Sequence, residues 1–212
     1  SLGMNKPLND KAVFEYISDP AKPVPYTSQI EGLTFTPRNF MSDDQRNASR
    51  RPDVLTFETE VLTEDTTLAG EILAKLDVSM TGTDADFVVK LIDVYPDNFE
   101  YETNKKDYLM SGYQQLVRGE IMRGKYRNSF EKPEAFVPNK PTAVKFTLPD
   151  IAHTFKKGHR MMIQIQSSWF PLADRNPQQF MNIYEAKDSD FKKATIRIYH
   201  DASAIQLPVL KN

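Results

Sequence analysis

Residues 71–80 read EILAKLDVSM, and this stretch decides the fold class. Every even position is apolar, namely Ile72, Ala74, Leu76, Val78 and Met80. The odd positions are mostly polar and include Glu71, Lys75, Asp77 and Ser79. Because successive side chains of a β-strand point to opposite faces, this period of two predicts a strand with one face in the core and one largely in water.

Similar alternation recurs at 55–61, 144–148 and 195–198. Two further runs, 87–95 and 160–170, are apolar on both faces and therefore predict central strands. Lys90 and Asp93 interrupt the first of these runs. Turn-forming residues separate the runs at 81–84, 95–98, 138–141 and 157–158. Many strands with irregular connections and no internal repeat predict an all-β fold, a jelly-roll β-sandwich.

The first fifty residues differ from the rest of the chain. They contain Pro20, Pro23, Pro25 and Pro37 among polar residues, without sustained alternation. Proline cannot donate to a β-ladder, so we expect residues 1–50 to form an extended arm that packs on something outside the sandwich, or else a disordered tail. Residues 51–212 are expected to form the jelly roll. Ser1-Leu2-Gly3 ahead of Met4 resembles a cloning remnant, so we expect the natural N-terminus to be missing.

The composition excludes several classes of partner and site. Lys and Arg number 27 and Asp and Glu 29, so no general positive field is present to hold a nucleic acid. No apolar run approaches the roughly 20 residues that cross a bilayer. Cysteine is absent, which excludes disulfides, thiolate catalysis and Cys-ligated zinc. No cofactor or metal is expected, although Asp84 and Asp86 leave open a calcium site as the alternative to solvated turn carboxylates.

A catalytic serine needs a histidine in reach and an acid to orient it. The G-x-S-x-G elbow is absent, and the chain has only His153, His159 and His200. Ser167 and His159 lie eight residues apart in one predicted strand, which places them about 27 Å apart. We therefore expect no catalytic residue in this chain and read His153 and His159 as structural. Only His200, approaching a serine from a neighbouring strand, would keep a self-contained hydrolase possible.

The segment 167–177, SSWFPLADRNP, stands out because it contains the single tryptophan and ends a strand. Trp169 and Phe170 precede a proline, and Asp174, Arg175 and Asn176 follow in a turn. One interpretation is a rim that meets a partner domain or ligand. The other is a structural loop in which an acid and an arginine hold the turn over the core edge.

Several ordered motifs resemble the C-terminal domain of the X-Pro dipeptidyl-peptidase-like serine hydrolases. This group includes cocaine esterase, the α-amino acid ester hydrolases and the glutaryl-7-aminocephalosporanic acid acylases. The motifs are Asp19-Pro20 with Pro23-Val-Pro25, Asp44-Gln-Arg46, Arg51-Pro-Asp-Val-Leu55, Thr83-Asp-Ala-Asp-Phe87, Lys90–Pro96, Gly119–Arg127, Lys156–Arg160, Gln166–Pro171 and Asp174–Pro177. The resemblance runs from about residue 16 to 210 and looks closest to the ester hydrolase and acylase branch.

The resemblance implies a division of labour. In this family an α/β-hydrolase domain carries the Ser-His-Asp triad, a helical cap covers it, and a jelly roll follows. This chain matches only the jelly roll and its lead-in, so no triad residue carries over. Family jelly rolls supply wall residues to the acyl pocket, and Leu33 and Phe35 stand in the matching place.

We therefore predict a non-catalytic domain of an α/β serine hydrolase, inactive when isolated, whose partner is the catalytic domain of the same parent chain. An uncovered apolar interface would favour a homo-oligomer. The resemblance slightly favours a periplasmic or secreted location. The alternative function is a carbohydrate- or ligand-binding module, since such jelly rolls resemble galactose-binding-like domains and Trp169 with Tyr184 would supply an aromatic platform.

Overall fold

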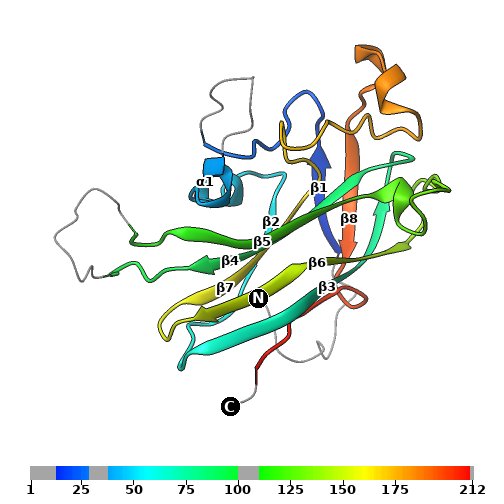
Figure 1. Cartoon of the computed structure of the whole chain (residues 1–212). Helices are drawn as coiled ribbons and strands as arrows, with labels where there is room; N and C mark the ends of the chain where they lie inside the picture. The colour runs from blue at the N-terminus through cyan, green and yellow to red at the C-terminus, as the bar shows by residue number, and fades with distance from the viewer. Residues whose placement is uncertain (1–12, 29–37, 100–109, 211–212) are drawn as a thin grey trace.

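Two antiparallel β-sheets pack face to face in the computed structural model, which describes residues 13–28, 38–99 and 110–210 (Figure 1). The strands are β1 (Val13–Ser18), β2 (Leu55–Glu58), β3 (Thr66–Met80), β4 (Asp86–Val94), β5 (Gln114–Arg123), β6 (Thr142–Phe155), β7 (Arg160–Gln166), β8 (Ala194–Tyr199) and β9 (Ala204–Gln206). The short helices are α1 (Arg46–Ser49) and the 3-10 turns η1 (Arg38–Met41), η2 (Gly124–Tyr126), η3 (Ile183–Glu185) and η4 (Asp188–Asp190). Within these ranges no helix is long and apolar enough to cross a bilayer.

The strand order confirms the predicted jelly roll. One sheet has the order β1-β8-β3-β6, with β9 added to β3, and the other has the order β2-β7-β4-β5. Most connections between consecutive strands therefore cross from one sheet to the other, and only β4 and β5 are both consecutive and paired. Eight strands that alternate between two sheets in these orders have the topology of a jelly roll.

Strand β6 continues beyond the predicted segment 144–148, through Pro149. Its register with β3 shifts between Gly70 and Ile72, opposite this proline. Gly70 adopts a φ of 123°, which a residue with a side chain rarely reaches. A proline is tolerated at a bulge on an edge strand because no ladder hydrogen bond is lost there. The bulge therefore explains why the strand does not end at Leu148.

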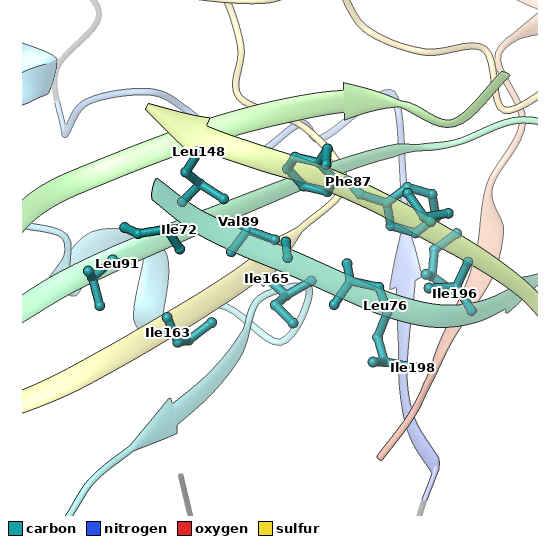
Figure 2. Close-up of a cluster of buried hydrophobic side chains, with 14 of the residues drawn as sticks. Ile72, Leu76, Phe87, Val89, Leu91, Leu148, Ile163, Ile165, Ile196 and Ile198 are labelled. Atoms are coloured by element: carbon teal, nitrogen blue, oxygen red, sulfur yellow. The ribbon is translucent and has the colours of Figure 1, made fainter. Parts of the chain in front are cut away.

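The core lies between the two sheets, as the alternation predicted. Figure 2 shows side chains from both sheets pointing toward one another in this layer. The central members are Ile72, Leu76, Phe87, Val89, Leu91, Leu148, Ile163, Ile165, Ile196 and Ile198. All even positions of the 71–80 stretch are buried, from Ile72 to Met80. Burying an aliphatic side chain of this size stabilises the fold by about 1.5–3 kcal/mol, so this layer provides the main favourable term.

All nine residues of β4 are buried, which confirms it as a central strand. Phe87, Val89 and Leu91 face the core between the sheets. Val88 and Ile92 face the opposite way and belong to separate apolar clusters. The outer face of this sheet is therefore covered by a further layer of chain.

That layer is the arm itself, which packs on its own sandwich. Pro25 forms a β-bridge with Phe170, and Asp44 forms one with Gln115. Tyr26 is buried in a cluster with Val88 and Trp169. The expectation that the arm needs a surface outside the sandwich is therefore wrong for the described residues. The reason is that the four-stranded sheet offers an apolar outer face that the arm covers.

One strand of the sandwich also lies inside the predicted arm. Strand β1 pairs antiparallel with β8 over six residue pairs, from Val13 with Tyr199 to Ser18 with Ala194. The change in chain character expected at residue 50 thus does not mark the edge of the jelly roll. The proline-containing segment is instead an insertion between β1 and β2.

Candidate functional site

A buried lysine lies beneath the arm, on the outer face of the four-stranded sheet. Lys90 is 0% exposed and its ammonium nitrogen donates to Oε1 of Gln45 at 3.0 Å. The same nitrogen lies 4.8 Å from the centre of the Trp169 ring. Burial lowers the Lys90 pKa from 10.5 to about 7, because the charged form loses its water and gains no carboxylate.

The neighbours of Lys90 leave room for this arrangement. Gly119 lies directly across from Lys90 on β5, and Gln164 lies across from it on β7. A Cβ on Gly119 would come within 2.9 Å of the Trp169 ring. The indole therefore packs over a strand position that only glycine allows.

A second network joins the Thr83–Phe87 motif to the Asp174–Pro177 motif. Asn176 donates to Asp84 at 3.1 Å and to Asp86 at 2.8 Å through its Nδ2. Arg123 forms a two-point ion pair with Asp86, with both nitrogen–oxygen distances 3.0 Å. Asp84 also accepts the backbone N–H of Lys125 at 2.9 Å. The side chains of Asp84, Asp86 and Asn176 are buried, whereas that of Arg123 is partly exposed.

Burial and the neighbouring Asp86 raise the pKa of Asp84 from 3.8 to about 6. The hydrogen bonds from Asn176 and the Lys125 backbone act in the opposite direction and do not outweigh burial. Both interpretations of Asp84 and Asp86 at the sequence level are wrong. They are neither solvated turn carboxylates nor free calcium ligands, because protein donors occupy their oxygens.

A third network links two of the three histidines through one buried carboxylate. Asp93 accepts from His159 Nδ1 at 2.7 Å and from His153 Nε2 at 2.9 Å. The His159 ring also lies 4.5 Å from the Tyr95 ring. No serine joins this group among the described residues, and its hydrogen bonds join β4 to β6 and to the residue that precedes β7. The structural role predicted for His153 and His159 agrees with this geometry.

The serine with the best position in sequence belongs to a different network. Ser167 shares a 2.7 Å hydrogen bond with the hydroxyl of Tyr16. Burial raises the pKa of this tyrosine. Ser167 follows the C-terminal end of β7, and His159 precedes its N-terminal end. His200 packs on Phe14, and its buried Nδ1 has no hydrogen-bond partner in the described part of the chain. Within 13–28, 38–99 and 110–210, no serine, histidine and acid converge.

The described ranges also contain no group of three or more His, Asp or Glu placed to hold a metal ion. An open hollow of about 640 Å³ lies between β5, the loop after η2, and β6. Its lining includes Ile121, Phe130 and Lys145 and contains no histidine. Ser129 in this hollow accepts two backbone N–H groups, from Glu131 and Lys132. The hollow therefore has no activated nucleophile.

The segment 167–177 forms a loop that is hydrogen-bonded to the arm. Phe170 exchanges two backbone hydrogen bonds with the arm, donating to Val24 and accepting from Tyr26. Arg175 donates to the Pro20 carbonyl at 3.1 Å and lies 4.7 Å from the Phe191 ring. The Asp174 carbonyl accepts from Arg123 at 2.9 Å.

These contacts favour the structural interpretation of the loop, with a change in its detail. The residue that meets carboxylates is Asn176, whereas Arg175 bonds a carbonyl oxygen. Trp169 is only 5% exposed and packs against Phe40, with the ring centres 5.9 Å apart. It therefore does not form the exposed platform that a carbohydrate module needs. Tyr184, its suggested partner, is 85% exposed. Leu33 and Phe35 lie outside the described residues.

Comparison with known proteins identifies the family of the chain. Residues 6–205 match the model of the X-Pro dipeptidyl-peptidase C-terminal non-catalytic domain. The chain belongs to this family. It is 33% identical to the cocaine esterase of Rhodococcus sp. (strain MB1 Bresler) over 199 residues, which are 92% of this chain and 32% of that protein.

Two solved structures share the fold at higher identity. An aminopeptidase from a marine sediment Thaumarchaeota archaeon is 41% identical, with a TM-score of 0.90 over 99% of this chain and 35% of that one. An α-amino acid ester hydrolase is 46% identical, with a TM-score of 0.85 over 93% of this chain and 32% of that one. The chain thus spans about a third of the length of these relatives.

Proposed function

We propose that this domain is the non-catalytic C-terminal β-sandwich of an α/β serine hydrolase, packs on the catalytic domain of the same parent chain, and helps to shape its acyl pocket. The observation that carries the proposal is the family match over residues 6–205 to a domain described as non-catalytic. The relatives are about three times as long, which leaves room for a separate catalytic domain.

The geometry of the described residues supports an accessory role. Three buried ionisable groups have structural partners: Asp93 bonds His153 and His159, Asp86 pairs with Arg123, and Lys90 bonds Gln45 of the arm. A serine becomes nucleophilic only when a base accepts its proton, and Ser167 instead bonds a tyrosine. In the parent, the nucleophile would therefore come from outside this domain.

The parent would cleave an ester or amide of a small acyl compound through an acyl-enzyme. Candidate substrates are an α-amino acid ester, a β-lactam side chain or an X-Pro peptide. The names of the relatives support this range, since they include an esterase, an amino acid ester hydrolase and an aminopeptidase.

Leu33 and Phe35 would supply the apolar wall of the acyl pocket. The described residues that flank them in sequence support this role, because Tyr26 and Phe40 pack together with ring centres 5.7 Å apart.

The test uses the full-length parent enzyme with Leu33→Ala or Phe35→Ala. Loss of one apolar wall residue costs about 1–3 kcal/mol of substrate discrimination, so kcat/KM for the preferred acyl group should fall roughly tenfold or more while short acyl groups change little. Phe130→Ala is the matched control, since Phe130 is 79% exposed and far from the arm in sequence. Equal kinetics for all variants and acyl lengths would remove the pocket role. A parent gene without a catalytic serine domain would remove the whole proposal.

A further inference from the structure

A buried amine with one hydrogen-bond acceptor lies where the arm meets the sheet. Lys90 Nζ has one hydrogen-bond acceptor, Gln45 Oε1, and Gln45 belongs to the arm. An ammonium carries three N–H donors, whereas a neutral amine carries two. Burying a charge without enough partners is costly, and the protein avoids that cost by keeping such a group neutral.

The surroundings of Lys90 are polar but uncharged. Gln164 and Gln166 lie on the same face of β7 and are both buried, and each has an Oε1 without a hydrogen-bond partner. Trp169 Nε1 is likewise buried and unpartnered in the described residues. The site under the arm therefore contains several buried polar atoms without a hydrogen-bond partner, and no carboxylate is bonded to Lys90 in the described part of the chain.

The ionisable groups on the surrounding elements have other partners. In the arm, Asp43 accepts from Thr27, and Asp44 pairs with Arg46. On β4, Asp86 pairs with Arg123, and Asp93 with His153 and His159. On β5, Arg118 donates to backbone carbonyls, and Glu120 accepts the Ile121 N–H. On β7 the charged residue is Arg160, at the first position of the strand. None of these acids is hydrogen-bonded to Lys90 among the described contacts.

We propose that Lys90 and Gln45 form a pH-sensitive contact, in which the arm packs firmly on the sheet while the Lys90 amine is neutral and loosens when it takes up a proton. When the arm lifts, Lys90 enters water, where the ammonium form is favoured. Proton uptake is therefore coupled to opening of the arm. This inference goes beyond the proposed accessory role and does not depend on it.

The direction of the pH effect follows from the coupling between proton binding by Lys90 and opening of the arm. Lys90 has a pKa of about 7 when buried and 10.5 when exposed, so the open form binds more protons between these values. The arm is therefore packed most firmly on the sheet above pH 10.5, the pKa of exposed Lys90, and this packing weakens as the pH falls toward 7. The opening equilibrium constant should rise roughly tenfold per pH unit across this window and level off below it.

Hydrogen exchange of the arm amides tests this coupling. The probes are the N–H groups of Val24 and Tyr26, which donate to Ser168 and Phe170. Amides in the β3–β6 ladder serve as an internal reference. Wild type and Lys90→Met are compared at the same pH between 7 and 9.5, so the intrinsic exchange rate cancels. Lys75→Met, on the outer face of β3, is the matched lysine control.

We expect the arm protection of wild type, relative to Lys90→Met, to fall by about tenfold per pH unit as the pH is lowered. Lys75→Met should behave as wild type. If Lys90→Met does not fold, Gln45→Met provides the second test: it should raise arm opening at every pH and keep the slope. An identical pH dependence in wild type and Lys90→Met would overturn the proposal. So would a change of equal size in the β3–β6 reference amides, because the coupling would then be to global unfolding.

Discussion

Replacement of Asn176 by leucine would remove the amide that joins two buried carboxylates. Leucine has a similar size, so the change deletes hydrogen bonds with little change in volume. Asn176 donates to Asp84 and Asp86, and its Oδ1 accepts the backbone N–H of Gln178 at 2.7 Å. All three bonds are lost together.

The expected cost follows from the remaining partners. A hydrogen bond to a charged group contributes about 1.5–3 kcal/mol. Asp84 keeps two backbone N–H donors and Asp86 keeps Arg123, so the lower end applies and the two bonds amount to about 3 kcal/mol. The unpaired Gln178 N–H adds about 1 kcal/mol. We predict a loss of about 4 kcal/mol, a large part of the 5–15 kcal/mol typical of a domain.

Urea unfolding followed by circular dichroism measures this loss. With a slope of about 1–3 kcal/mol per molar urea, the midpoint should fall by about 2 M. Asn128→Leu is the control, since Asn128 donates to the carboxylate of Glu134 at the surface. Its expected loss is below about 1 kcal/mol. If Asn176→Leu cost no more than this control, the network would not hold the loop.

The pH dependence of the same variant has a defined sign. The Asp84 pKa is about 6 in the folded protein and 3.8 in water, so protonation of Asp84 favours the folded state below pH 6. Asn176 lowers this pKa, and removing it should raise the pKa further. The stability difference between wild type and Asn176→Leu should therefore shrink as the pH falls from 7 to 5. A difference that grows over this range would contradict the assigned role of Asp84.

Three further changes follow from the contacts. Arg123→Met should lower the unfolding free energy by about 3 kcal/mol, measured by urea unfolding, because it removes the ion-pair partner of the buried Asp86 and leaves only the Asn176 amide; a loss below about 1 kcal/mol would oppose this. Gly82→Ala should destabilise the fold by about 3 kcal/mol, since the new Cβ would lie 2.3 Å from the Gln178 carbonyl oxygen. An unchanged melting temperature would show that the loop moves freely. Tyr16→Phe should cost about 1 kcal/mol, through the lost bond to Ser167, and no change in the urea midpoint would argue against that bond.

The fold could be predicted largely from the sequence because its signal is local. The alternation of 71–80 specifies a half-buried strand, and the double-sided apolar run at 87–95 specifies a central one, as β3 and β4 show. Pro149 was less informative, because a bulge on an edge strand depends on the register with β3. The arm was misjudged for the same kind of reason: its apolar residues, such as Val24 and Tyr26, are spaced irregularly and fit only the sheet that receives them.

The polar sites were less predictable than the strands. Lys90 and Asp93 are visible in sequence as charges within an apolar run, which marks them as buried groups in need of partners. The identity of those partners is a matter of tertiary contact: Gln45 is 45 positions from Lys90, and His153 is 60 positions from Asp93. The motif 174–177 pointed to an acid and an arginine as the residues that hold the turn, whereas the side chain that bonds two buried carboxylates is that of Asn176.

The most direct test of the accessory role is an activity measurement on this chain alone. The purified chain is incubated with p-nitrophenyl esters of several acyl lengths and with a fluorophosphonate probe that labels activated serines. The account predicts no turnover above the buffer rate and no labelled serine, because Ser167 lacks a base. Turnover that co-purifies with the folded chain and disappears in a Ser→Ala variant would contradict it.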